Sequence, residues 1–231
     1  MTPHRAKRSQ YLTYLRVSLI VALLGIVLYY LDASTFGRFL GTLNPLITIL
    51  VSILTGALLL YYLMEKAQFV VHQPSPFRTH LILIGIAFLF GFEVVIADIW
   101  FLDYPADINI PFPKSLLFYP TIGFIAEVFF HLLPLTIGIF VLSQFANLSQ
   151  SKIVWISILL VAILEPGYQM WFARQNSAAT MIYTGVHVFL FSLTQLVILK
   201  RFGFVSMYAF RLGFYAIWHV VWGALRLDVL F

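Results

Sequence analysis

The sequence predicts an all-α fold, a polytopic bundle of about seven transmembrane helices. Of its 231 residues, 61% are hydrophobic and only 10% are charged, whereas about a quarter of the residues in soluble globular domains carry a charge. Mostly apolar stretches of about 18 residues or more follow one another, and each is long enough for a helix to cross a bilayer. No polar segment is long enough to form a separate soluble domain, so we expect one membrane domain over residues 1–231.

Each predicted span is an apolar stretch bounded by charged or turn-forming residues. The first lacks a small-residue cleavage site, so we expect a retained anchor and not a cleaved signal peptide. The fourth is long and carries Pro120 and Pro134, which predicts a helix that is kinked, tilted or extended beyond the lipid. In order, the predicted spans are residues 15–31, 44–64, 80–101, 115–144, 152–171, 178–199 and 206–229.

Lysine and arginine are distributed unevenly between the two ends of the predicted spans. Nine lie in the N-terminal tail and alternate loops, and four lie on the opposite side. Because cytoplasmic loops carry the excess of these residues, we expect a cytoplasmic N-terminus, in the plasma (inner) membrane. The nine are Arg5, Lys7, Arg8, Arg16, Lys66, Arg78, Lys152, Lys200 and Arg201, and the four are Arg38, Lys114, Arg174 and Arg226.

The charge and the cysteine content exclude several functions. The formal net charge is +5, but the cations fall between apolar runs, so they are interpreted as topology signals and not as a nucleic-acid surface. Membrane lipid is the expected surrounding partner. The absence of cysteine excludes disulfides, thiolate metal sites and cysteine nucleophiles.

Five polar residues lie well inside predicted spans. A charged group near the bilayer centre costs about 2.5–3.5 kcal/mol on insertion scales, so such residues normally face the bundle interior and find partners. Glu127 and His131, in "EVFFHLLP", are four residues apart and so share one helix face. This pair fits half a metal site, an acid–base pair or a simple buried hydrogen bond. The five residues are Glu127, His131, Glu165, His187 and His219.

Glu165 precedes Pro166 and Gly167, and this order predicts a break or kink in the fifth helix. Irregular backbone at membrane depth is tolerated only where it is buried in protein or lines a wet cavity. A carboxylate at such a break is therefore a functional candidate. The alternative is that Glu165 lies at the solvated end of a short span.

His187 and His219 lie near the middle of the sixth and seventh predicted spans. A single histidine on an aromatic helix is more often a hydrogen-bonded core residue than a ligand. Three histidines and two glutamates on four consecutive spans, however, suit zinc or another divalent metal. They equally suit a water activated by a general base.

Other polar residues of the spans are weaker candidates. Glu93 has no obvious partner, and Asp98 is close enough to a span end to reach water. Arg211 and Arg226 are expected to anchor the ends of the last span. Tyr215 shares a helix face with His219, which suggests a structural role behind the histidine.

The stretch "MYAFRLGFYAIWHVVWG", residues 207–223, resembles the final motif region of the CPBP family of intramembrane proteases. This family includes the type 2 CAAX prenyl proteases and the abortive-infection or bacteriocin-immunity proteins. In the family, a helix ends in an Arg-Thr-Gly-like turn and the next helix carries His-x-x-x-Asn. The matching positions here are Arg211, Leu212 and Gly213 at the turn and His219 at the histidine, with Gly223 in place of the asparagine.

The first motif of the family, Glu-Glu-x-x-x-Arg, matches Ala126, Glu127 and His131. The first glutamate, which is the catalytic carboxylate of the family, is thus an alanine here. The resemblance covers about residues 115–231, where it implies a CPBP-like core.

The second motif of the family, Phe-x-x-x-His, has two placements in this sequence. Val161 and Glu165 match it at a spacing close to that of the family, whereas Tyr183 and His187 keep the histidine at a longer distance. The first placement is preferred for its spacing, and it puts His187 on an extra intervening helix.

The resemblance implies a divergent intramembrane peptidase that hydrolyses a bond in a membrane-associated protein or peptide. In this hypothesis Glu127 or Glu165 takes a proton from a bound water, and histidines such as His219 polarise the water and the scissile carbonyl. A divalent metal such as zinc would draw its ligands from Glu127, His131, Glu165, His187 and His219. The missing glutamate and asparagine favour the alternative, a catalytically inactive CPBP-like protein with an immunity, binding or scaffold role. A haem held between histidines on facing spans is a third hypothesis.

Overall fold

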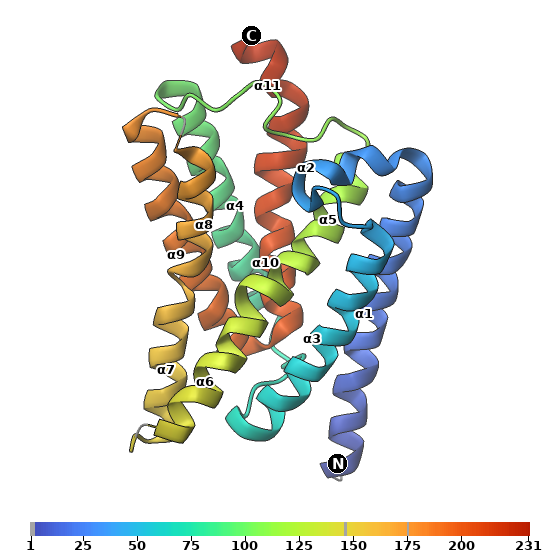
Figure 1. Cartoon of the computed structure of the whole chain (residues 1–231), viewed down its shortest axis with the longest axis vertical. Coiled ribbons are helices and arrows are strands. Elements are labelled where there is room, and N and C mark those ends of the chain that lie inside the picture. Colours follow the sequence, from blue (N-terminus) through green and yellow to red (C-terminus); the bar gives the residue numbers. More distant parts are fainter. Residues whose placement is uncertain (1–2, 146, 175) are drawn as a thin grey trace.

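A computed structural model describes residues 3–145, 147–174 and 176–231. It confirms an all-α bundle and an integral membrane protein, because seven helical segments are long and apolar enough to cross a membrane. The segments run along the long axis of the molecule and the two termini lie at opposite ends (Figure 1). Each predicted span overlaps one of these segments, which are Lys7–Leu40, Pro45–Ala67, Phe77–Trp100, Ser115–Gln144, Gln150–Trp171, Ala178–Phe202 and Phe204–Leu230.

Four of the spans consist of more than one helical piece. A 3₁₀ turn, η1, joins α1 to α2 in the first span, and π-helical turns, η2 and η3, interrupt the fourth and the seventh. The bounds are α1 Pro3–Asp32, η1 Ala33–Phe36, α2 Gly37–Leu40, α3 Pro45–Ala67, α4 Phe77–Trp100, α5 Ser115–Ala126, η2 Glu127–Leu132, α6 Leu133–Phe145, α7 Gln150–Val161, α8 Leu164–Ala173, α9 Ala178–Phe202, α10 Phe204–Tyr215, η3 Ala216–Val221 and α11 Trp222–Leu230.

Local sequence signals set several helix ends. The Asn44 side chain accepts a hydrogen bond from the Ile47 amide at 3.2 Å, and Pro45 occupies the first turn of α3, where its missing N–H costs nothing. At the other end of α3, Gln68 adopts the left-handed conformation (φ 57°), a common way to end a helix. Ser177 caps α9 in the same manner as Asn44 caps α3, because its hydroxyl accepts from the Thr180 amide.

The fourth span crosses the bundle diagonally, from α5 through η2 to α6 (Figure 1). Pro134 lacks the N–H that would bond the carbonyl four residues earlier, and its ring crowds that carbonyl. The turn ahead of it is widened, so that the Leu133 amide bonds the Val128 carbonyl, five residues back. The predicted irregularity of this span is therefore a tilt combined with a π-turn.

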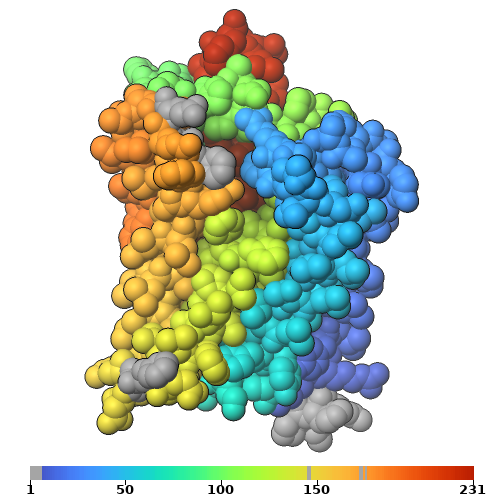
Figure 2. All heavy atoms as spheres, viewed as in Figure 1, coloured from blue at the N-terminus to red at the C-terminus, as the bar shows by residue number. Residues whose placement is uncertain are grey.

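All seven spans contribute buried side chains to the main apolar core. Contacts join α10 to α4 and α9, α8 to α9, and α6 to α7, while α1 packs on α3 and α5. On the face shown in Figure 2, the fourth span fills the space between α7–α8 and α3. Large apolar side chains on the outer faces of the spans are exposed, as expected of surfaces that lipid covers.

Gly203 fixes where α10 begins. Its φ is +89°, and a Cβ there would lie 2.8 Å from the carbonyl oxygens of Val70 and Val71, so only glycine fits this close approach. Those two carbonyls accept hydrogen bonds from the amides of Phe204 and Val205, at 3.2 and 2.9 Å. The loop before α4 thus satisfies the first free amides of α10 and holds the helix that carries Arg211.

Candidate functional site

A buried group of charged and polar side chains lies between the last four spans, and we call it the carboxylate–arginine cluster. It contains three of the five predicted residues. None of its members exposes more than 4% of its surface. The members are Glu127 and His131 of η2, Glu165 of α8, Gln195 of α9 and Arg211 of α10.

Glu127 and His131 contact each other as their spacing predicts. Nδ1 of His131 lies 2.5 Å from Oε2 of Glu127, and the other ring nitrogen, Nε2, lies 3.5 Å from Oε2 of Glu165. His131 therefore stands between two carboxylates. Its Nε2 is buried and has no hydrogen-bond partner.

The predicted break in the fifth span is present, between the end of α7 at Val161 and the start of α8 at Leu164. Glu165 lies in the first turn of α8, where the helix dipole favours a negative charge, and Pro166 follows it in the same turn. Glu165 is only 4% exposed. The alternative of a solvated span end is therefore wrong.

Arg211 is the centre of the cluster. Its Nε donates to Oε1 of Glu127 at 2.6 Å. Its two terminal nitrogens donate to the two oxygens of Glu165 at 3.1 and 3.0 Å. This is the two-point geometry in which a guanidinium binds a carboxylate most firmly. The expectation that Arg211 anchors a span end is wrong, since it lies inside the bundle and bonds residues of three other spans.

Neutral side chains complete the cluster. The amide nitrogen of Gln195 donates to Oε1 of Glu127, and its oxygen accepts from Arg211 at 3.0 Å. The Ser192 hydroxyl donates to Oε2 of Glu165 at 2.9 Å. The Tyr215 hydroxyl accepts from Arg211 at 3.0 Å. Every carboxylate oxygen of the cluster therefore has at least one donor, as buried polar groups require.

The formal charges of the cluster depend on His131. Two carboxylates and one guanidinium leave one negative charge, and a protonated imidazole cancels it. Both nitrogens of the ring face carboxylate oxygens, so a protonated His131 has acceptors on both sides. His131 therefore lies between the same two carboxylates that Arg211 binds.

The donor set does not fit a metal ion well. A divalent cation at Glu127, His131 and Glu165 would lie beside the Arg211 guanidinium, which already binds both carboxylates. Among the residues that the structure describes, no group of three or more His, Asp or Glu side chains is placed to hold a metal ion. The histidine and the carboxylates are arranged around the arginine.

His219 lies outside the cluster. Its Nδ1 is 2.6 Å from Oδ1 of Asn109, in the loop after α4, and its ring stacks on Tyr119 with centroids 4.3 Å apart. The rings of His219 and Tyr215 meet edge to face with centroids 4.9 Å apart, which supports the predicted role of Tyr215 behind the histidine. Tyr215 also bonds Arg211, so one aromatic ring links His219 to the cluster.

His187 pairs with a residue that had no predicted partner. Its Nδ1 lies 2.6 Å from Oε2 of Glu93 on α4. The Tyr183 ring stacks on the imidazole, and the Phe90 ring meets it edge to face. These side chains line a groove of about 470 Å³ between α4 and α9. The five predicted residues thus divide between three separate places.

Asp98 and Arg226 form a second buried ion pair. Nε of Arg226 donates to Oδ2 of Asp98 at 2.6 Å, and Trp222 donates to the same oxygen at 2.7 Å. Arg226 also bonds the carbonyls of Tyr104 and Pro105, which ties the loop after α4 to the last helix. The expectation that Asp98 reaches water is wrong, because it is 3% exposed.

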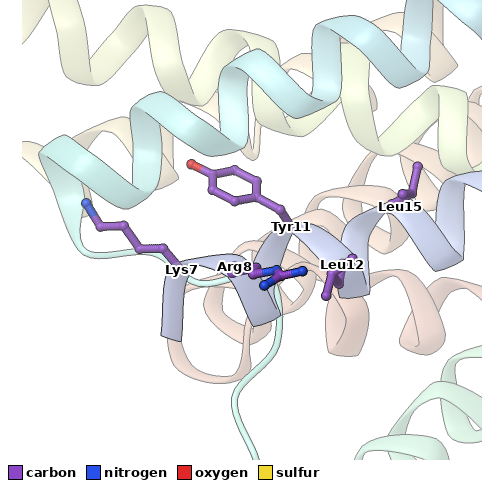
Figure 3. Close-up of a pocket in the computed structure, with 5 residues that line it drawn as sticks. All are labelled: Lys7, Arg8, Tyr11, Leu12 and Leu15. Atoms are coloured by element: carbon purple, nitrogen blue, oxygen red, sulfur yellow. The ribbon is translucent and has the colours of Figure 1, made fainter. Parts of the chain in front are cut away.

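A shallow hollow of about 400 Å³ lies beside the N-terminal part of α1. In Figure 3, Lys7 and Tyr11 point toward the neighbouring α3, and Arg8 and Leu12 point away from it. Lys7 pairs with Glu65 at 2.5 Å. All five residues that line the hollow are exposed, so it contains no buried polar group and is not a candidate site.

Comparison with known proteins gives no relative. No family model, no curated protein and no solved structure matches the chain.

Proposed function

We propose that this protein is a non-catalytic membrane protein with a binding or scaffold role, a CPBP-like bundle without hydrolytic chemistry. The observation that carries the proposal is the position of Arg211, which binds Glu127 through Nε and Glu165 through both terminal nitrogens. A general base needs a carboxylate oxygen that can reach a water molecule. Here those oxygens are held by protein donors, at less than 5% exposure of either glutamate.

The cluster has a structural role in this proposal. It joins η2, α8, α9 and α10, which belong to four different spans. Bilayer lipid gives helices little hydrophobic reason to associate, so interhelical hydrogen bonds and close packing hold such bundles together. Removing one partner of a buried ion pair leaves the other uncompensated, at a cost of about 3–5 kcal/mol. In this proposal the cluster therefore stabilises one packing arrangement of the last four spans.

The test combines activity and stability. The purified protein is incubated with membrane-associated peptides beside its Glu127→Ala and Glu165→Gln variants, and products are read by mass spectrometry. The proposal expects no cleavage by any of the three, and a lower unfolding temperature for both variants. Cleavage by the unmodified protein that both variants lose would overturn it.

One observation favours a second candidate, the divergent peptidase. Positions matching all three motifs of the resemblance, Glu127, Glu165 and Arg211, meet at one point, next to a break in the fifth span. In that case Arg211 must leave a carboxylate before water or a metal can approach it. The experiment above separates the two candidates, and addition of zinc to the same assay extends it to a metal-dependent reaction.

The orientation is also a proposal. The excess of Lys and Arg at the N-terminal end of the bundle supports a cytoplasmic N-terminus in the plasma (inner) membrane. Because the chain has no cysteine, a single introduced one is a unique label. Cysteine at Asp107, in the loop after α4, should react with an impermeant maleimide on intact cells, whereas cysteine at Ser75 should react only after lysis. The reverse pattern would invert the topology.

A further inference from the structure

The groove between α4 and α9 contains a carboxylate that the carboxylate–arginine cluster does not use. Glu93 exposes 52% of its side chain, while its partner His187 exposes 8%. Around Glu93 the surface is apolar and exposed, with Leu89 at 67% and Val186 at 56%. A half-exposed carboxylate on a lipid-facing surface is unusual, since ionisable residues of spans normally face the bundle interior.

The depth of this carboxylate limits what can reach it. Glu93 lies seven residues before Trp100, the last residue of α4, which is about 10 Å along a helix. His187 lies nine residues after the first residue of α9 at the same end, about 13 Å along. Lipid head groups stay at the surface of a hydrocarbon core about 30 Å thick, so their cations remain above this level.

The Glu93–His187 pair is held in place and incompletely satisfied. The imidazole packs among aromatic rings: it is nearly parallel to those of Tyr183 and Phe191, and it meets Phe90 edge to face. Its Nδ1 bonds Glu93 at 2.6 Å, whereas its Nε2 is buried without a hydrogen-bond partner. The other side of the Glu93 carboxylate faces the groove, where a cation or a strong hydrogen-bond donor could bind it.

The shape of the groove suits a helix. Its walls are two long helices, α4 and α9, and it is lined by apolar side chains apart from the polar group at its centre. On α4 the exposed face continues from Glu93 to Leu89 and Gly85, at helical spacing of four residues. A Cβ at Gly85 would meet nothing within 4 Å, so this point is open to the close approach that small residues allow between membrane helices.

We propose that this groove binds a transmembrane helix of a partner protein, and that the helix carries a lysine or arginine that pairs with Glu93. A spanning helix can place a cation at any depth, which a lipid head group cannot. The proposal rests on the binding role proposed above and names the class of its partner. In a second copy of the chain, Arg211 and Arg226 are buried and already paired, so neither of them is available to Glu93.

The test uses synthetic transmembrane peptides in phosphatidylcholine vesicles. The probe is a Leu/Ala helix with one lysine seven residues from one end, and the control peptide has leucine there. Binding is measured by energy transfer from a fluorophore on a single cysteine introduced at Asp107, in the otherwise cysteine-free chain. We expect the lysine peptide to bind at least about tenfold more tightly than the leucine peptide.

Variants locate the binding. Glu93→Gln should bring the affinity for the lysine peptide down to that of the leucine peptide, whereas Glu65→Gln, at the end of α3, should change nothing. Val186→Trp fills the groove without altering its charge and should lower the binding affinity for both peptides. Equal affinity for the two peptides, or a preference that survives Glu93→Gln, overturns the proposal. Energy transfer between two copies of the protein would also overturn the proposal if Glu93→Gln abolished it. In that case the groove would bind a second copy of the chain.

The same samples keep the two proposals separate. Peptide cleavage, read by mass spectrometry after the binding measurement, refutes the non-catalytic function whatever the affinities are. Intact peptides without a lysine preference refute the groove as a helix site and leave the non-catalytic function standing.

Discussion

The protein contains two carboxylate–histidine pairs that differ in their surroundings. Glu127 and His131 are fully buried, and Arg211 and Gln195 bind the carboxylate from the other side. Glu93 and His187 have nearly the same separation, 2.6 Å against 2.5 Å, but the carboxylate is half exposed in a groove. The same two chemical groups thus form a fully buried contact in one place and a half-exposed contact in the other.

The difference shows that a pair of functional groups does not define a site by itself. In the cluster, the guanidinium donates hydrogen bonds to oxygens of both carboxylates. In the groove, the imidazole holds the carboxylate from behind and leaves its outer side accessible. The cation that closes the first pair is part of the chain, whereas we propose that a partner supplies the cation for the second.

The largest expected effect comes from removing the central cation. Arg211→Gln leaves two buried carboxylates without compensation and should lower the free energy of unfolding by about 3–5 kcal/mol. Denaturant unfolding of the purified protein in mixed micelles measures this loss. Arg201→Gln, an exposed cation at the end of α9, is the matched control and should stay within about 0.5 kcal/mol of the unmodified protein. Similar losses in the two variants would contradict the central role of Arg211.

Removing the charges of Glu127, Glu165 and Arg211 together should destabilise the protein less than removing that of Arg211 alone. In the triple variant Glu127→Gln, Glu165→Gln and Arg211→Gln, no uncompensated charge remains in the core. It should recover about 2 kcal/mol or more of the stability that Arg211→Gln alone loses. The same unfolding measurement applies. A triple variant as unstable as the single one would mean that hydrogen-bond geometry, and not charge, dominates the cluster.

The two pairs can be compared directly by the same substitution in each. Glu127→Gln should cost about 2–3 kcal/mol, because the charged bonds to Arg211 are lost in a buried site. Glu93→Gln should change the free energy of unfolding by less than about 0.5 kcal/mol, because its side chain is half exposed. Equal costs would show that the surroundings do not distinguish the pairs.

The smallest effect lies outside the spans. Hydrogen bonds from the Thr180 hydroxyl and the Ser177 amide lower the pKa of Asp103, in the loop after α4. Because the folded-state pKa of Asp103 is lowered, its ionised carboxylate stabilises the fold fully above the unfolded-state pKa of about 3.9. This stabilisation is lost as the pH falls through the folded-state pKa. Asp103→Asn should therefore lower the unfolding temperature slightly at pH 7, and the difference should shrink below about pH 4. A difference that does not vary with pH would contradict this assignment.

The fold could be predicted from hydropathy, because a span needs only a long apolar stretch. All seven spans were predicted in this way. The Glu127–His131 contact and the break beside Glu165 also followed, since both depend on local spacing and on proline chemistry. The hydrogen-bond partners of these residues on other spans could not be predicted from the sequence. Gln195 and Ser192 are common polar residues with no local signal, and the pairing of Glu93 with His187 joins positions 94 residues apart.

Arg211 could have been found by a charge argument. It stands in an apolar stretch two turns from the start of α10, and two carboxylates were already placed at similar depth. A buried cation is the partner that two buried carboxylates require. We instead assigned Arg211 to a span end and so did not pair it with the carboxylates. The sequence does not show that α10 begins directly after Gly203, which places Arg211 well inside the bundle.

The most direct test of the contrast between the two pairs is labelling with dicyclohexylcarbodiimide, a lipid-soluble reagent that modifies accessible carboxyl groups. The folded protein is treated in lipid vesicles, digested and mapped by mass spectrometry. The account predicts modification of Glu93 and none of Glu127 or Glu165, since their oxygens are bound inside the cluster. Modification of Glu127 or Glu165 in the folded protein, with Glu93 unmodified, would contradict it.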